Sequence, residues 1–261
     1  MQSLLHTFMI HGETSHHGPL NLILKNLTSD QLQAGIAASD QLQAGIAALA
    51  HDVVDAVIHW KLSRGILEAT ETWPLVTQQS NTFWSLTVKA HVNFSVVCMC
   101  RVFDKEHKSL HLPGLLQIIE QNLRLFNEFE FRARLRDNPF VASLAESARI
   151  PDIKQLTKDI TLCSQSDPIV KRLTIHRNTA VAHLSQELKL NGIAVTSQVE
   201  ITNPEFETLL SRANEIVNRY SSLFSAEYFS TQIVGHDDYK TIFRWIQERV
   251  ESERSKYRTE Q

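Results

Sequence analysis

The chain contains few residues of the kinds that interrupt helices. Only eight of its 261 residues are glycine and seven are proline. Apolar residues make up 43% of the chain and recur at intervals of three and four over most of its length. That spacing places side chains on one side of a helix, whereas a half-buried strand needs a spacing of two. We therefore expect an all-α fold with a sizeable core.

Cysteine is also scarce. The three cysteines, Cys98, Cys100 and Cys163, are too few for a disulfide framework and include no paired C-x-x-C of the zinc-binding kind. Cys98 and Cys100 are two residues apart, so they point to different sides of a helix and are expected to pack in the core. Free cysteines fit a reducing cytoplasm, and we expect neither a cofactor nor a metal ion.

Long apolar runs and an excess of positive charge are both missing. The longest apolar stretches, such as residues 96–100, are far too short to cross a bilayer, and the first residues lack the features of a signal peptide. We expect a cytoplasmic protein with no membrane partner. The 26 basic and 29 acidic residues give a net charge of −3, so any RNA would bind to local patches. The candidate patches are Lys171, Arg172 and Arg177, and Arg132, Arg134 and Arg136.

The second patch lies in a charged segment, residues 129–138, for which a solvated connector is the alternative interpretation. The segment alternates arginine with apolar residues ahead of Pro139. Such alternation is compatible with a surface that faces nucleic acid. Sequence alone does not choose between the two interpretations.

The chain divides into three parts by composition. Residues 1–28 have no regular period and are expected to be an N-terminal extension. Residues 29–228 are expected to form a helical bundle domain, which begins with a perfect decapeptide repeat (residues 29–38 and 39–48). The repeat unit is too short, and repeated too few times, for a solenoid. Residues 236–257 form an additional amphipathic helix, whose apolar face must pack on the bundle or on a second chain.

Apolar periodicity and capping residues predict the helices of the domain. In the second of them, Phe83, Leu86 and Phe94 are expected to face inward. In the last, Asn203 is expected to be the N-cap, ahead of Pro204. The predicted helices are 49–67, a single helix from 71 or 76 to 103, 112–126, 153–162, one that begins after Asp167, and one that begins at 203.

The helix after Asp167 has an unusual apolar stripe. Asp167 is a good N-cap and Pro168 suits the first helical position. The stripe includes Leu173 and Val181, and Arg177 lies between them, four residues from each. An unpaired buried charge is costly, so Arg177 requires an anionic partner, a neighbouring subunit or a solvated cleft.

Arg177 and Asn178 are followed, after four residues, by His183. This arrangement resembles the arginine, polar residue, x4, histidine signature of the HEPN superfamily of all-helical proteins. Three upstream segments (residues 83–84, 96–104 and 109–116) resemble its abortive-infection AbiU-type branch. Arg101 and His107 have a similar spacing but lack the polar residue. We expect Arg101 to pair with a local carboxylate, Asp104 or Glu106.

The resemblance implies a metal-independent endoribonuclease that acts as a toxin or abortive-infection effector. His183 would exchange protons with the RNA, Arg177 would neutralise charge on the phosphorus, and Asn178 would orient either group. On one helix, residues six apart are separated by about 120° and about 9 Å. The HEPN family forms its site at a two-fold dimer interface, so a homodimer is expected. The other residues expected to contact RNA or support the site are His176, Arg172 and Lys171.

Three alternatives to a nuclease stay open. The chain could be a non-catalytic HEPN-like module that binds a protein or RNA, including an antitoxin or another defence-system partner. It could be a helical scaffold with no role in RNA chemistry. In the simplest structural interpretation, Arg177 forms a salt bridge with a carboxylate at the edge of the core, and His183 donates a hydrogen bond to a loop carbonyl.

Overall fold

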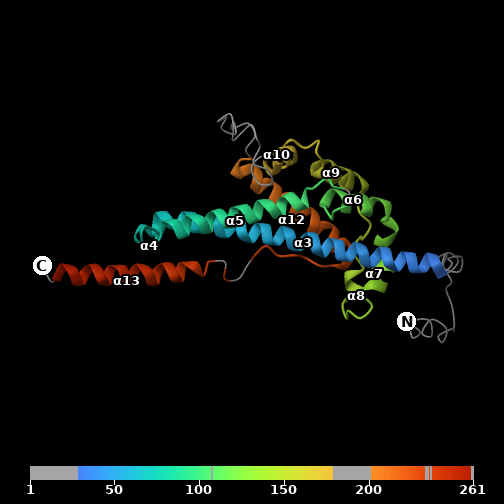
Figure 1. Ribbon diagram of the computed structural model, residues 1–261. Helices are drawn as coiled ribbons and strands as arrows, with labels where there is room; N and C mark the ends of the chain where they lie inside the picture. The colour runs from blue at the N-terminus through green and yellow to red at the C-terminus, as the bar shows by residue number, and fades with distance from the viewer. Residues whose placement is uncertain (1–28, 107, 179–200, 233–234, 236, 260–261) are drawn as a thin grey trace, which may run out of the picture. The chain divides into compact units, whose positions relative to one another are not determined.

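The computed structural model describes residues 29–106, 108–178, 201–232, 235 and 237–259 (Figure 1). The chain separates into two units, residues 1–41 and residues 42–261. The described part of the first unit, residues 29–41, is the helical beginning of α3 (Ser29–Thr72). The residues expected to form an N-terminal extension lie outside the described residues. All the contacts that follow belong to the second unit.

The elements after α3 are helices, and the described residues contain no strand, so the predicted all-α fold is confirmed. They are α4 (Pro74–Gln79), α5 (Asn81–Val102), α6 (Leu112–Gln121), the 3-10 helix η1 (Leu123–Phe126), α7 (Glu128–Arg134), α8 (Val141–Leu144), α9 (Ile153–Cys163), α10 (Pro168–His176), α12 (Asn203–Ser225) and α13 (Tyr239–Thr259).

The prediction of one continuous helix up to residue 103 was wrong. Trp73 and Ser80 have non-helical backbone angles, and they separate α3 from α4 and α4 from α5. Pro74 explains the first break, because it lacks an N–H and disfavours a helical conformation in the residue before it. The predicted third helix is likewise divided into α6 and η1 at Asn122.

Helices α3 and α5 lie side by side in opposite directions (Figure 1). Ser95 of α5 donates a hydrogen bond to the backbone oxygen of Ala56 of α3, at 2.7 Å. Near the C-terminal end of α5, Arg101 forms an ion pair with Asp52. The expected partner of Arg101 was a nearby carboxylate, and that expectation was wrong: Asp104 pairs elsewhere, with Arg177.

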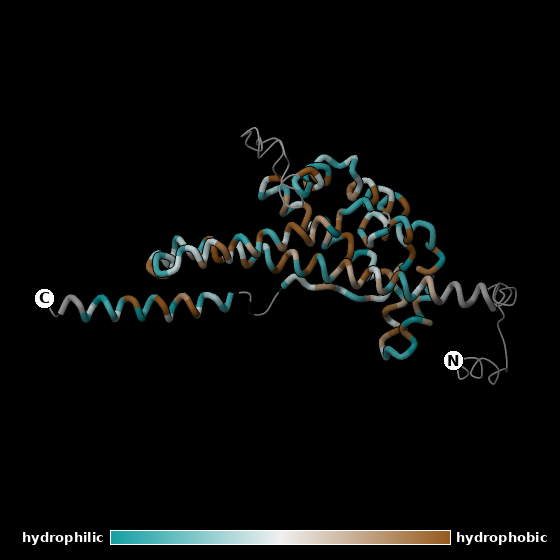
Figure 2. The backbone as a smooth tube through the Cα atoms, in the orientation of Figure 1, coloured by the Kyte–Doolittle hydropathy of each residue, from teal (hydrophilic) through white to brown (hydrophobic). Residues whose placement is uncertain are grey.

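Helix α12 supplies much of the core, and Figure 2 shows apolar residues recurring along it. Its N-cap is Thr202, one residue before the predicted Asn203. The Thr202 hydroxyl accepts a hydrogen bond from the Glu205 N–H, and the Glu205 carboxylate accepts one from the Thr202 N–H. This reciprocal capping box satisfies two backbone donors at the beginning of α12. Its buried apolar residues are Phe206, Leu209, Leu210, Ala213, Ile216, Val217, Tyr220 and Phe224.

The charged segment at α7 is neither a solvated connector nor a continuous basic surface. Phe131 is fully buried. Arg134 donates hydrogen bonds to the backbone oxygens of Leu125 (2.8 Å) and Phe224 (2.9 Å), and its guanidinium lies 3.8 Å from the centre of the Phe224 ring. Arg134 thus stabilises the C-terminal end of α12, and the predicted RNA-binding patch loses its central member.

A small apolar cluster joins α13 to the ends of α3, α4 and α5. Phe243 of α13 is fully buried beside Ile66 and Val76. By contrast, Phe83 and Leu86 of α5 are 56% and 60% exposed, although the apolar pattern predicted that they face inward. Phe94, also predicted to face inward, is exposed as well. Cys98 and Cys100 are buried, as predicted for core residues, and so is Cys163; none of the three forms a disulfide.

Candidate functional site

Helix α10 positions the arginine of the motif. Asp167 is its N-cap, as predicted, and the Asp167 carboxylate accepts hydrogen bonds from the first backbone N–H groups of the helix. Val170 and Leu173 are buried and fix the rotation of α10 against α12. At Arg177 and Asn178 the backbone becomes π-helical. Such wider turns are rare and often occur at functional sites.

Arg177 forms an ion pair with Asp104, which follows the C-terminal end of α5. The Arg177 Nη1 atom lies 2.9 Å from Asp104 Oδ1, and the two side chains are 27% and 21% exposed. Burial acts to raise the pKa of Asp104, but hydrogen bonds from Arg177 and from the Lys105 N–H outweigh it and hold the pKa below its usual value. Asp104 is therefore ionised at neutral pH and is the anionic partner that Arg177 requires.

The rest of the Arg177 guanidinium is oriented by its neighbour. Its Nε atom donates a hydrogen bond to the side-chain oxygen of Asn178, at 3.1 Å. Among the described residues, none accepts a hydrogen bond from Nη2. Because guanidinium carries five donors in a fixed plane, two fixed contacts leave a defined edge that can bind an oxyanion.

The other predicted site residues are only partly gathered around Arg177. Arg172 forms an ion pair with Glu205 in the capping box of α12, which makes it a link between α10 and α12. Lys171 is exposed, and His176 is half-buried at the end of α10. His183, the predicted proton-transfer residue, lies outside the described residues. The structure thus brings Arg177 and Asn178 together and adds Asp104, which the sequence analysis had assigned elsewhere.

A cavity of about 480 Å³ adjoins this ion pair. Asp104 forms part of its wall, together with residues of α6 and of the loop that follows α9. His111, also in the wall, is the N-cap of α6: its Nδ1 atom accepts a hydrogen bond from the Gly114 N–H at 3.0 Å. Burial lowers the pKa of His111, against the opposing effect of Asp104 and Glu106. His111 is therefore neutral at pH 7, with its proton on Nε2.

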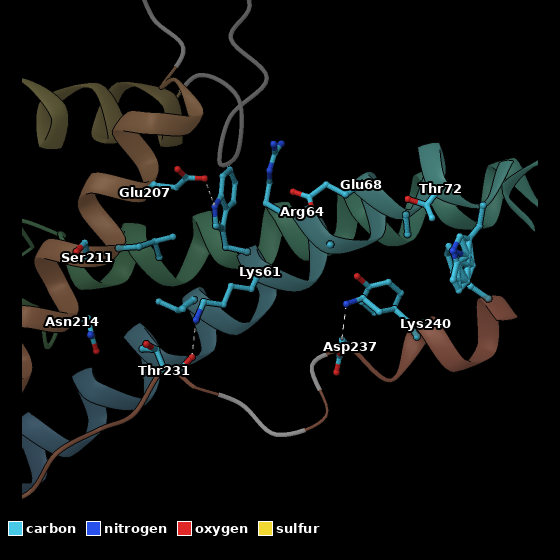
Figure 3. A pocket seen from close by; sticks show the side chains of 18 residues that line it. Lys61, Arg64, Glu68, Thr72, Glu207, Ser211, Asn214, Thr231, Asp237 and Lys240 are labelled. Atoms are coloured by element: carbon cyan, nitrogen blue, oxygen red, sulfur yellow. Dashed lines mark hydrogen bonds and ion pairs between the residues drawn. The ribbon is translucent and has the colours of Figure 1, made fainter.

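The larger cavity, of about 850 Å³, lies away from the motif, among α3, α12 and the beginning of α13 (Figure 3). Several of its polar groups are already engaged with one another. Trp60 donates a hydrogen bond to Glu207 at 3.1 Å, and Lys61 donates one to the backbone oxygen of Thr231 at 2.9 Å (Figure 3). No predicted site residue lines it. The candidate site is therefore the surroundings of Arg177, which include predicted site residues, and not the larger cavity.

The part of the chain that the structure describes contains no group of three or more histidine, cysteine or acidic side chains placed to hold a metal ion. Within the same residues, no helix has both the length and the apolar character needed to cross a bilayer.

The AbiU2 family model, which describes a HEPN domain, matches residues 39–242. The chain belongs to this family. The AbiU2 match covers more than three quarters of the chain and includes Asp104, Arg177, Asn178 and His183. It confirms the resemblance to the abortive-infection HEPN branch. Comparison with curated proteins and with solved structures found no match.

Asp104 is the residue of the candidate site that sequence reasoning missed. It stands 73 residues before Arg177, and no local spacing connects the two. The apolar stripe did indicate that Arg177 needs an anion, but it could not name which of the 29 acidic residues would supply it. The only local signal was the position of Asp104 just beyond a long helix that ends near the motif.

Proposed function

We propose that this AbiU2-family protein is a metal-independent endoribonuclease and serves as an abortive-infection or toxin effector. The observation that carries the proposal is the arrangement of Arg177. Its guanidinium is fixed by Asp104 and Asn178, it is only partly exposed, and its Nη2 edge has no acceptor among the described residues. A cation that is both oriented and accessible is what stabilisation of a reacting phosphate requires.

The reaction is a transesterification within RNA. His183 removes the proton from a ribose 2′-hydroxyl, whose oxygen attacks the neighbouring phosphorus. The bond from phosphorus to the 5′-oxygen breaks, and the departing oxygen takes up a proton. The products are a 2′,3′-cyclic phosphate and a 5′-hydroxyl. Arg177 neutralises the charge that accumulates on the phosphorus oxygens, and Asn178 holds the guanidinium or a phosphate oxygen.

In this proposal the protein acts as a homodimer. On a continuous helix, two residues six apart, such as Arg177 and His183, would be separated by about 9 Å and about 120°, too far to act on the same phosphate. A two-fold axis close to the motif would bring the arginine of one copy to the histidine of the other.

A non-catalytic binding module is the second candidate, and one observation favours it. The ion pair with Asp104 neutralises Arg177 inside the chain, so its charge has a structural explanation without RNA. The two candidates differ in what they expect of His183. A structural Arg177 needs no histidine six residues later, whereas the nuclease depends on it.

The test compares purified wild type with His183→Ala, Arg177→Lys and Asp104→Asn on total RNA, in the presence of a metal chelator. The nuclease proposal expects cleavage with cyclic phosphate ends by wild type and at least ~100-fold slower cleavage by His183→Ala, in line with the loss of a general base. Arg177→Lys should be slow because lysine keeps the charge but loses the fixed planar donors. Cleavage that survives in His183→Ala would reject His183 as the general base, and no cleavage by wild type would favour the binding module.

Asp104→Asn separates positioning from chemistry. If Asp104 acts through Arg177, this variant should lower kcat with little change in KM, and it should keep its fold by circular dichroism. Asp137→Asn is a matched control, because it makes the same substitution at an exposed carboxylate that pairs with Arg136 and does not line the cavity.

A further inference from the structure

We propose that the cavity beside Asp104 binds the base of an unpaired nucleotide adjacent to the phosphate that Arg177 holds. This inference rests on the proposed function, because it names the part of the RNA that the same site recognises. Asp104 lines the cavity and, through Oδ1, bonds Arg177. A phosphate on Arg177 and a base in the cavity are therefore separated by little more than one side chain, a span that a single nucleotide can cover.

The charges of the cavity wall argue for a neutral polar ligand. Only Asp104 and Lys105 of the lining residues carry a formal charge at neutral pH, and Asp104 is already paired with Arg177. One exposed lysine is a weak basis for binding a phosphate, which usually needs several donors or an arginine fork. The single carboxylate is equally insufficient for Mg²⁺ or Ca²⁺, each of which takes six or more oxygen ligands. An uncharged base needs neither several cationic donors nor several carboxylates.

The polar groups of the wall have the chemistry that reads a base. Gln117 and Gln121 lie one turn apart on α6, so their side chains share one face of the helix, and both are exposed. Gln165 donates to the Thr174 hydroxyl at 2.9 Å and keeps its carbonyl oxygen for another donor. Carboxamides pair a donor with an acceptor, as the edges of bases do, and side chains of this kind recognise unstacked bases.

Apolar side chains complete the wall. Leu110 and Ile118 each line the cavity and are each 45% exposed. They offer contact surface to the faces of a planar ring. The volume, about 480 Å³, is within the range of small-molecule sites (about 300–1,000 Å³) and suits one nucleoside rather than a helix or a duplex.

The wall is also held in place. His111 caps α6 through its hydrogen bond to Gly114, and a Cβ atom on Gly114 would lie 2.9 Å from the His111 ring. This close packing fixes the beginning of the helix that carries Gln117 and Gln121. Pre-organisation of this kind lowers the entropy that must be lost when a ligand binds.

The inference can be tested with RNA analogues that cannot react. The ligands are dinucleotides whose attacking 2′-hydroxyl is replaced by hydrogen, together with a matched analogue that carries the same phosphate but lacks one base. Binding to the full-length protein is measured by calorimetry for wild type, Gln117→Ala/Gln121→Ala and Glu120→Gln. Glu120 is exposed on the same helix but does not line the cavity, so Glu120→Gln is the matched control.

We expect wild type and Glu120→Gln to bind the dinucleotide equally. The double glutamine variant should bind it at least ~10-fold more weakly, which corresponds to about 1.4 kcal/mol. The abasic analogue should bind wild type as weakly as the dinucleotide binds the double variant. Equal binding of the dinucleotide and the abasic analogue, or equal binding to wild type and the double variant, would overturn the inference.

The same variants distinguish this inference from the nuclease proposal. Sequencing of cleavage ends should show that the double variant still cuts RNA but has lost the nucleotide preference of wild type. Cleavage with unaltered preference and unaltered dinucleotide binding would leave the nuclease standing and reject the base site. Base-dependent binding by a wild-type protein that never cleaves RNA would keep the base site and reject the nuclease.

Discussion

At the scale of single residues, Arg134 shows that a charged side chain can serve packing rather than RNA binding. Burial lowers the pKa of Arg134 to about 10, against the opposing effect of Glu130, so the group is still protonated at neutral pH. The backbone carbonyls of Leu125 and Phe224 accept its hydrogen bonds. Arg134→Met should remove those donors and lower the free energy of unfolding by about 2–4 kcal/mol, measured by urea denaturation.

Arg136 provides the control for this prediction. It lies two residues further along, and its side chain is mostly exposed beside Asp137. Arg136→Met should therefore change stability by no more than about 0.5 kcal/mol. If the two substitutions weakened RNA binding equally and left stability unchanged, the packing role assigned to Arg134 would be contradicted. The prediction of an RNA-binding basic patch would then stand.

His111 gives the stability of the protein a dependence on pH. Burial lowers the pKa of His111 in the folded state below the usual histidine value of 6.5. As the pH falls below about 6.5, the unfolded chain therefore takes up a proton more readily than the folded chain, and stability is lost until the lowered folded pKa is reached. His111→Asn should flatten this loss in urea titrations, while its side chain still caps α6.

His111→Asn should remove only part of the loss of stability at low pH. The pKa of His91 is also lowered, by burial and by the nearby His59, so part of the acid sensitivity belongs to that pair. An identical dependence on pH in wild type and His111→Asn would show that His111 does not contribute. A loss of stability in His111→Asn at pH 8 would instead indicate that asparagine fails to cap the helix.

At the scale of helices, the contact between α3 and α13 depends on one small residue. A Cβ atom on Gly65 would lie 2.5 Å from the hydroxyl oxygen of Tyr239. Gly65→Ala should push the beginning of α13 away from α3, destabilise the protein by about 1–3 kcal/mol and increase amide exchange in α13. Tyr239→Phe removes the clashing oxygen, so it should rescue Gly65→Ala and have little effect alone. If the changes in unfolding free energy of the two substitutions simply added in the double variant, this contact would be contradicted.

The apolar periodicity predicted the helices well, but it did not predict what packs against them. Asp167, Pro168 and the apolar stripe of α10 predicted that helix correctly, because capping and amphipathicity are local properties. The exposure of the Phe83 and Leu86 side chains could not be predicted, since the spacing of apolar residues does not reveal whether a neighbouring helix covers them. The Asp104 partner of Arg177 was missed for the same reason: their contact joins two segments that are distant in sequence.

At the scale of the whole molecule, the proposal depends on a second copy of the chain. If one continuous helix carries both Arg177 and His183, residues six apart would not converge on one phosphate within a single chain. If the site instead combines Arg177 of one copy with His183 of the other, each dimer has two such sites. Two inactive variants can then restore each other.

Arg177→Ala and His183→Ala subunits, mixed and re-equilibrated in equal amounts, should form mixed dimers. In each mixed dimer one site has lost both groups, and the other has regained an intact arginine and an intact histidine. With half of the dimers mixed and one working site in each, the mixture should recover about a quarter of wild-type cleavage. Each variant alone should stay inactive. Dimers, confirmed by light scattering, that recover no activity would mean that both groups act within one chain.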